Sequence, residues 1–387
     1  MVNFTTPVEW PRQLPRIDQR QKLLLMGSCF ASEMGQRLQQ AHFDCDLNPY
    51  GVLYNPLSIA TALNEILACR HYTTDDLFLH QGLWHSPMHH GEFSDADPIE
   101  VVHQINNRIE LSYSRLPQTD RVIITLGTAY IYRFTESLKE GDAPSSKTSH
   151  SLVEGNVSVA GPGSASSGSD AEAQPHSFHV AQPRSCNLAQ RWPGAVVGNC
   201  HKLPERYFQR QRITVYEAVE ALTPPLQRLF ALNPSLQVLI TVSPIRHLRD
   251  GLHANQLSKS TLLLAAESLC HRFANRLHYL PIYEVMTDEL RDYRFYADDL
   301  THPAPIALEY IWQQVEKHLF TPEAVEASAL CKALQKQLSH RPLHPETEAY
   351  KRFLEQTMLK ISQICAKFPY LDLKNEQEQC RTQLNRL

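Results

Sequence analysis

The sequence predicts an α/β protein whose central parallel sheet is covered by helices on both faces. Short apolar runs alternate along the chain with segments whose apolar residues recur at helical spacing. The predicted strands are residues 23–26, 122–126, 238–242 and 279–283, and clear helical patterns include 59–67 and 261–277. Predominantly apolar runs of this length are typical of strands buried on both sides, and alternation with helices is typical of a parallel sheet.

The first strand leads directly into a turn that could hold a catalytic or binding residue. Its apolar run ends at Gly27-Ser28, and Met34, Leu38 and Ala41 then recur at helical spacing. Ser28 is thus predicted at the carboxyl end of a strand and at the start of a helix. Binding sites of open α/β sheets lie at such ends, and a helix N-terminus favours a developing negative charge. Ser28 is therefore either a nucleophile or a helix cap, since serine is also a favoured capping residue.

Residues 139–190 differ in composition from the rest of the chain. They are rich in Ser, Gly, Pro and Ala and contain few large apolar residues. Such a segment buries too little surface to offset the entropy cost of ordering it. We predict a low-complexity mobile insertion. It acts either as a lid over a site or as a tolerated surface insertion, and long loops cost little extra closure entropy.

A second set of candidate catalytic residues lies near the end of the α/β pattern. Asp299 and His302 are three residues apart and directly precede another helical pattern. A short loop can turn the carboxylate onto the imidazole, where it fixes the tautomer and stabilises the imidazolium. Together with Ser28 these residues would form a hydrolytic triad. Asp298 is a rival for the orienting role.

Residues 321–387 form a helical extension. One apolar stripe is Val325, Leu330, Leu334 and Leu338, and a second is Tyr350, Leu354, Met358, Ile361 and Cys365. Residues 341–345, with two prolines, separate them. Two amphipathic helices joined in this way predict a helical hairpin. The hairpin packs either on the core or on another subunit, which would give a homo-oligomer.

Composition and charge narrow the class of protein. The chain has 387 residues, 42% of them hydrophobic, and a net charge of −4, which favours no nucleic-acid partner. No apolar run approaches the ~20 residues that span a membrane. The N-terminus lacks the pattern of a signal peptide, so we expect a cytoplasmic protein. The nine cysteines include no Cys-x-x-Cys, which argues against a disulfide framework or a structural zinc site.

Several motifs spread over about residues 20–320 resemble those of a known family. They are Gly27-Ser28-Cys29-Phe30-Ala31 and the segments 48–56, 125–129, 197–204, 243–247 and 289–296, together with Asn255, Ser258 and Lys259. The sequence resembles the GSCFA-domain proteins of the SGNH/GDSL hydrolase superfamily. The resemblance implies a three-layer, flavodoxin-like SGNH hydrolase fold over residues 1–320. It also implies Ser28 as nucleophile and His302 as base.

The chain departs from the superfamily pattern in two sequence blocks. The first block usually reads Gly-Asp-Ser, whereas Ser28 here follows Gly27 directly. The third usually carries Gly-x-Asn-Asp, whereas Gly127-Thr128 is here followed by Ala-Tyr. The usual oxyanion asparagine is therefore not visible at its expected place.

The expected activity is hydrolysis of an O-acyl ester, for example an acylated carbohydrate, through a serine acyl-enzyme and without a cofactor. Backbone N–H groups of Ser28 and Gly51 are predicted to hold the oxyanion, with Asn55 or Thr128 as the side-chain donor. An acyltransferase with the same triad is one alternative. A non-catalytic binding module that keeps the fold is another.

Cys29 is the alternative nucleophile, because a helix N-terminus also favours a thiolate. Neighbouring side chains in this turn point in different directions, so Cys29 is predicted to lie in the core.

His201, Arg246 and His247 are candidate substrate contacts, and either histidine could replace His302 as base. Lys202 and Lys259 are further candidate cationic contacts to an anionic group, against the alternative of surface salt bridges.

His85, His89 and His90 have the side-chain type of metal ligands, but their spacing is not that of a zinc site. They are expected to be solvated loop residues, with a place in the pocket wall as the alternative for His85, and we predict no metal.

Overall fold

The computed structural model describes residues 5–136, 188–340, 342–343 and 347–385. Most of the insertion predicted at 139–190 lies outside these ranges. Its last three residues begin the short helix α4 (Leu188–Arg191).

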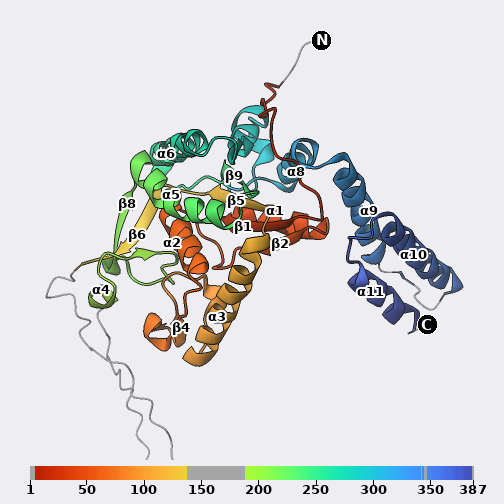
Figure 1. Ribbon diagram of the computed structural model, residues 1–387, viewed down its shortest axis with the longest axis horizontal. Coiled ribbons are helices and arrows are strands. Elements are labelled where there is room, and N and C mark those ends of the chain that lie inside the picture. Colours follow the sequence, from red (N-terminus) through yellow and green to blue (C-terminus); the bar gives the residue numbers. More distant parts are fainter. Residues whose placement is uncertain (1–4, 137–187, 341, 344–346, 386–387) are drawn as a thin grey trace, which may run out of the picture.

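The central sheet has five strands, all parallel, which confirms the predicted α/β class (Figure 1). The strands are β1 (Lys22–Gly27), β2 (Asp44–Leu47), β5 (Arg121–Leu126), β9 (Gln237–Val242) and β10 (Leu277–Leu280). Their spatial order is β2-β1-β5-β9-β10. Numbered along the chain, this is the 2-1-3-4-5 order of flavodoxin-like sheets, in which ligands bind where the order reverses. That position is the carboxyl end of β1 and β5, where Ser28 follows β1.

Alternate residues of the strands pack against two helical layers. Leu24 and Met26 belong to a core shared with α2 (Pro56–Leu67), α3 (Pro98–Arg115), α5 (Val215–Leu232) and α6 (Gly251–Arg272). Leu23 and Leu25 belong to the core on the other face, which includes α1 (Cys29–Gln40) and α8 (Pro305–Leu319). Both faces of the sheet are therefore buried, as the predominantly apolar runs predict.

Three of the four predicted strands are confirmed, and the fourth is displaced. The run at 279–283 overlaps only the end of β10, because the chain turns at Pro281 into α7 (Ile282–Glu284) and a π-helical turn (Val285–Glu289). Proline lacks the N–H that would continue the ladder. The predicted helix at 261–277 belongs to α6, which begins ten residues earlier, at Gly251, and ends at Arg272.

Two small antiparallel sheets accompany the parallel sheet. Neither was predicted from the sequence. One is the pair β3 (Phe78–His80) and β4 (Leu83–His85). The other, called here the ribbon, consists of β6 (Tyr130–Phe134) between β7 (Val196–Val197) and β8 (Phe208–Arg212). In Figure 1 β6 and β8 lie beyond one end of the parallel sheet. The short 3₁₀ turns are Thr74–Asp76, Gly91–Phe93, Leu116–Gln118, Glu205–Tyr207 and Tyr293–Phe295.

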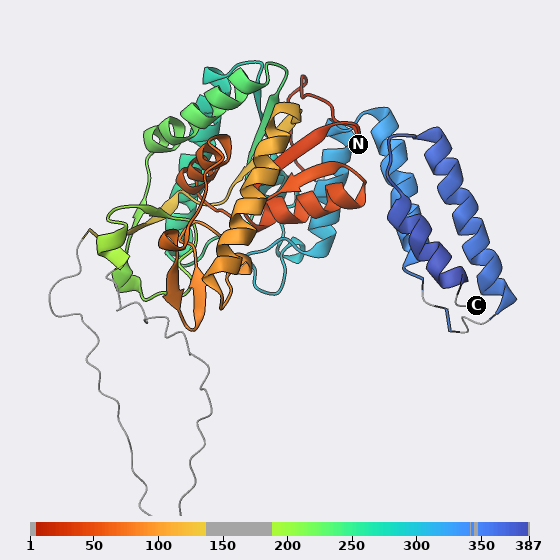
Figure 2. The ribbon, with the colours of Figure 1, turned by 60° about the horizontal axis from the view of Figure 1, so that its bottom comes forward.

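The C-terminal extension contains three helices within the described residues, one more than the predicted hairpin. They are α9 (Pro322–Leu338), α10 (Glu348–Lys367) and α11 (Lys374–Leu384), grouped beside the α/β body in Figures 1 and 2. They share a core that includes Leu334, Leu338 and Ile361. The stripe predicted for α9 is partly wrong, since Val325 is 40% exposed and small residues such as Ala327 face the core instead.

The sequence analysis missed α11 because it is strongly polar and buries only Cys380. Among the described helices, none has the length and apolar character needed to cross a bilayer.

Candidate active site

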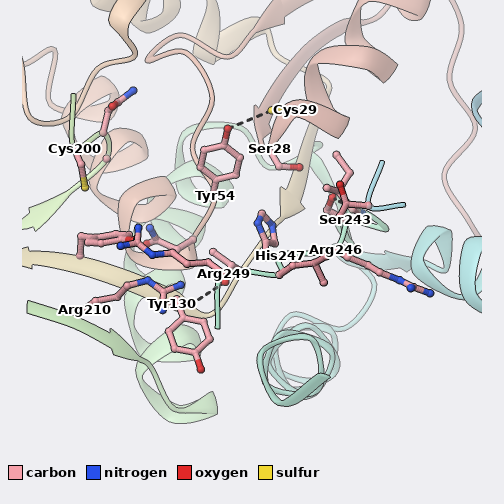
Figure 3. A pocket seen from close by; sticks show the side chains of 18 of the residues that line it. Ser28, Cys29, Tyr54, Tyr130, Cys200, Arg210, Ser243, Arg246, His247 and Arg249 are labelled. Carbon is pink, nitrogen blue, oxygen red and sulfur yellow. Dashed lines mark hydrogen bonds between the residues drawn. The ribbon is translucent and has the colours of Figure 1, made fainter. Parts of the chain in front are cut away.

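A cavity of about 650 Å³ lies at the carboxyl ends of β1, β5 and β9 (Figure 3). Its walls come from the β1–α1 turn, the start of α2, the ribbon, the segment after β9 and the loop before α8. It brings together six of the residues predicted from sequence: Ser28, Asn55, Thr128, Arg246, His247 and His302. Gly51 and His201 do not line it, and Asp299 reaches it through His302.

Ser28 caps α1 by position but not by hydrogen bonding. Its backbone is extended (φ −71°, ψ 179°), and its side chain makes no capping bond. The residue is 1% exposed, and Oγ is buried without a hydrogen-bond partner in the described part of the chain. A buried unpaired hydroxyl costs about 1–3 kcal/mol, so its persistence points to a use other than stability.

Cys29 is not in the core, contrary to the sequence prediction. It is exposed and lines the cavity, with Sγ 3.2 Å from the hydroxyl of Tyr54 (Figure 3). Phe30 and Ala31, the next residues of α1, are the ones buried under the sheet. Cys29 therefore begins the helix on its solvent side, and two nucleophilic residues border the same cavity.

Asp299 and His302 form the hydrogen-bonded pair that their spacing predicts. His302 Nδ1 lies 2.5 Å from Asp299 Oδ2, while Asp299 Oδ1 accepts from the backbone N–H groups of His302 and Thr301, each at 2.9 Å. These bonds hold the pKa of Asp299 well below its ordinary value, so the carboxylate stays charged. The contact assigns the proton to Nδ1 and leaves Nε2 as the basic nitrogen.

Asp298 is exposed and makes no hydrogen bond to His302. Of the two aspartates, Asp299 is thus the one that contacts the imidazole.

The predicted nucleophile and base share the cavity without touching. No hydrogen bond joins Ser28 Oγ to His302, whose side chain is 51% exposed. Catalytic hydrogen bonds are often long in unliganded enzymes and tighten when substrate binds. The absence of this bond in the structure without a ligand is therefore compatible with the predicted pair.

The two backbone donors predicted for the oxyanion are already used. Ser28 N donates to Thr125 O at 3.3 Å, and Gly51 N donates to Asn48 O at 2.7 Å. Gly51 instead serves a tight turn with φ +73°, where an added Cβ would lie 2.1 Å from His90. This part of the oxyanion prediction is wrong.

Two other residues that line the cavity, Cys29 and Asn55, carry N–H groups without a partner in the described structure. Ala31 and Ser32 bond to the carbonyl of Ser28, which leaves Cys29 and Phe30 as first-turn N–H groups of α1 without an intrahelical partner. Asn55 caps α2 by accepting from Ser58 N at 2.9 Å through Oδ1, and its amide nitrogen is left for a ligand.

Thr128 is engaged in two structural hydrogen bonds, whereas the amide nitrogen of Asn55 has no partner among the described residues. Its hydroxyl lies 3.1 Å from Ser258 Oγ and accepts from Tyr130 N at 3.1 Å. Asn55 is therefore the side-chain donor that the geometry favours.

One face of α6 holds the loops that carry the site. Asn255 accepts from His247 N at 3.0 Å, and Ser258 accepts from Ala129 N at 2.8 Å. Lys259 is fully buried, and its Nζ donates to Gly127 O and Ser243 O, each at 2.7 Å. Lys259 is thus not a cation offered to substrate, contrary to the sequence prediction.

Burial lowers the pKa of Lys259 to about 7. Its neutral amine still carries the two N–H groups that the two bonds need. The link between the ends of β5 and β9 therefore survives loss of the proton.

Replacing Lys259 by Met is expected to lower the free energy of unfolding by about 2 kcal/mol, because two buried carbonyls lose their donor. Any turnover at the cavity should fall at least about tenfold, since both loops then lose their common anchor. Urea unfolding and ester assays measure the two effects. The exposed Lys202, replaced by Met, is the control. Equal unfolding free energies and equal turnover in the two variants would contradict the anchoring role of Lys259.

His247 borders the cavity as a neutral side chain. Burial, with a smaller effect of the Lys259 charge, lowers its pKa to about 4. Its Nε2 is buried without a partner in the described chain. A histidine with this pKa is a weak base at neutral pH and suits substrate contact, which favours His302 for proton transfer.

His201 belongs to a histidine cluster behind β4 rather than to the cavity. Its ring centroid is 4.3 Å from that of His85, and its Nε2 lies 2.9 Å from Ser86 O. Ser86 Oγ in turn contacts His89 Nδ1 at 2.9 Å. His85 and His89 are buried, so they are not the solvated loop residues that the sequence predicts. Among the described residues, no group of three or more His, Cys, Asp or Glu side chains is placed to hold a metal ion.

This cluster predicts acid-sensitive stability. Burial lowers the pKa of His85 and His89, and it lowers that of His201 to about 4. Between pH 6.5 and 4 the unfolded chain binds protons that the folded chain refuses, so the free energy of unfolding falls as the pH drops. For His201 the loss is on the order of 3 kcal/mol at pH 4.

Urea midpoints between pH 7.5 and 5 measure this effect. His201→Gln should flatten the pH dependence, whereas the exposed His253→Gln should leave it unchanged. Equal slopes in the wild type and His201→Gln would contradict the assignment.

The sequence analysis missed the wall formed by the ribbon. Tyr130 and Tyr132 of β6 and Arg210 of β8 line the cavity, as does Arg249 after β9. Arg246, which was predicted, donates to Tyr296 OH at 3.0 Å, and its backbone N–H donates to Thr301 O at 3.2 Å, beside the Asp299–His302 pair.

Comparison with known families agrees with the motifs. The GSCFA family matches residues 22–148 and 189–315, on both sides of the predicted insertion. The C-terminal domain of GSCFA domain proteins matches residues 331–386, which include most of the three-helix extension. No curated protein and no solved structure matches the chain. On these matches the chain belongs to the GSCFA family.

Proposed function

We propose that this protein hydrolyses O-acyl esters through an acyl-enzyme formed on Ser28. The observation that carries the proposal is the unpaired, buried Ser28 Oγ on the cavity that also holds His302, whose Nδ1 contacts Asp299. The strand order and the Asp-x-x-His loop before the last helix of the α/β body also support membership of the SGNH/GDSL superfamily. An acylated carbohydrate remains the proposed kind of substrate.

The proposed reaction has two steps. His302 Nε2 takes the proton of Ser28 Oγ as this oxygen attacks the ester carbonyl, and then gives the proton to the departing alcohol. Water repeats the sequence on the acyl-serine and releases the acid. The N–H of Cys29 and the amide of Asn55 face the developing oxyanion, and each such donor typically contributes about 10²- to 10³-fold in rate.

A screen of short acyl esters and acetylated sugars tests the proposal, with Ser28→Ala as the control. Turnover that disappears in Ser28→Ala supports it. A screen without turnover, by a protein that still binds an acetylated sugar, would favour a non-catalytic binding module instead.

The second candidate is an acyltransferase with the same triad, in which an acceptor hydroxyl replaces water. The exposed thiol of Cys29 adds a second form of this candidate, with the acyl group on sulfur. A thioester on Cys29 would hand its acyl group to an acceptor hydroxyl, and the cavity is large enough for a donor and an acceptor. Product analysis with and without a sugar acceptor separates the two: transfer yields an acylated sugar and hydrolysis yields the free acid.

A further inference from the structure

The cavity wall formed by the ribbon carries positive charge that the proposed ester chemistry does not use. The described residues lining the cavity include three arginines and no aspartate or glutamate. Arg246 is engaged with Tyr296 beside the triad loop. The other two, Arg210 and Arg249, come from β8 and from the segment after β9, and Figure 3 shows them close together near Tyr130.

Both guanidinium groups are held in place by tyrosines of β6. The Cζ atom of Arg210 lies 4.1 Å from the centre of the Tyr130 ring, and Arg249 donates a hydrogen bond to Tyr132 OH. Tyr130 and Tyr132 are two residues apart on one strand and therefore share a face of the ribbon. This support fixes two long side chains that would otherwise lose much conformational entropy on binding a ligand.

The carboxylates that pair with these two arginines leave some guanidinium N–H groups without a partner. Arg210 pairs with Asp250 and Arg249 with Glu205, and neither carboxylate lines the cavity. Glu205 is 85% exposed, so its pair with Arg249 is weak. Each guanidinium has five N–H donors, and Asp250 and Glu205 each contact one terminal nitrogen, so further donors remain on both groups.

We infer that Arg210 and Arg249 form an anion subsite, so that the substrate is an acyl ester bearing a carboxylate, phosphate or sulfate group. Paired guanidinium groups match the two oxygens that such groups present and bind them through charge-assisted hydrogen bonds. The inference rests on the proposed ester hydrolysis for its substrate class, whereas the anion subsite itself stands on the arginines alone.

Matched esters test the substrate class. Mono-4-nitrophenyl succinate carries its anion on the acyl side and 4-acetoxybenzoate on the alcohol side. The methyl esters of these two compounds are their neutral counterparts, and the uncatalysed hydrolysis of each compound is subtracted. We expect kcat/KM for at least one anionic ester to exceed that of its counterpart by about tenfold or more. Arg210→Gln and Arg249→Gln should remove most of that preference. The control is Arg212→Gln, which removes an exposed charge from the same strand outside the cavity lining and should keep it.

A binding arm separates failure of this inference from failure of the esterase proposal. Calorimetric titration of the Ser28→Ala protein with sulfate and with phosphate needs no turnover, and Arg210→Gln should weaken binding about tenfold or more. Binding that depends on Arg210 and Arg249 without turnover of any ester would leave the subsite in place and overturn the esterase. Equal turnover of anionic and neutral esters, with sulfate and phosphate binding unaffected by either arginine variant, would overturn the subsite.

Discussion

Replacing His302 by Ala is expected to reduce ester turnover to background while the protein stays folded. The side chain is half exposed, so its loss should change the free energy of unfolding by less than about 0.5 kcal/mol. Its Nδ1 lies 2.5 Å from Asp299 Oδ2, whereas Nδ1 of His90, another histidine that borders the cavity, is 3.7 Å from Glu92 Oε1. Asp299→Asn should lower kcat by roughly 10³-fold, because an amide no longer fixes the tautomer or stabilises the imidazolium. Steady-state kinetics and urea unfolding provide the two readouts.

The neighbouring Asp298 offers a matched control for this prediction. Asp298→Asn removes the same charge one residue away and should leave kcat nearly unchanged. If Asp298→Asn damages turnover and Asp299→Asn does not, the orienting carboxylate has been misassigned. Full activity in His302→Ala would exclude this residue as the base and direct attention to His247.

Ser28→Ala is the second change expected to have a large effect, and it should act in opposite directions on activity and stability. Turnover should fall to background because the acyl acceptor is lost. The free energy of unfolding should be unchanged or higher, by up to about 1–3 kcal/mol, because a buried hydroxyl without a partner is removed. An ester assay and urea unfolding on the same preparation measure both effects.

Cys29 supplies the comparison for Ser28. Cys29→Ala should keep most turnover, since the proposed reaction uses the N–H of this residue and not its thiol. Turnover lost in Cys29→Ala and kept in Ser28→Ala would transfer the nucleophile to the thiol and favour the acyltransferase candidate.

Much of the sheet could be predicted because burial on both faces leaves a plain signal. The strands β1, β5 and β9 contain predominantly apolar runs, and their positions are confirmed. The strands of the ribbon could not be predicted in the same way. Much of β8 is polar, and β7 has only two residues, so neither produces a recognisable pattern. The two arginines of the anion subsite were missed because that wall depends on the ribbon.

The candidate site likewise has features that the sequence predicts and features that it does not. The pairing of Asp299 with His302 is local, so spacing along the chain was enough to predict it. The role of Lys259 depends on the carbonyls of Gly127 and Ser243, which follow two strands far from Lys259 in the sequence, and nothing in the sequence distinguishes a buried lysine from an exposed one. For Cys29, only the start of α1 in three dimensions decides whether the thiol faces the core or the cavity.

The central claim is that Ser28 is an activated nucleophile, and mapping the adduct of a fluorophosphonate probe tests it most directly. The probe forms a tetrahedral adduct with a serine activated by a histidine beside oxyanion donors. Peptide mapping of the labelled protein should find one adduct, on Ser28, and His302→Ala should slow its formation strongly. Cys29→Ala should still be labelled, which separates the hydroxyl from its neighbouring thiol. An adduct on Cys29, or no labelling of Ser28 under conditions in which the protein turns over an ester, would contradict the account.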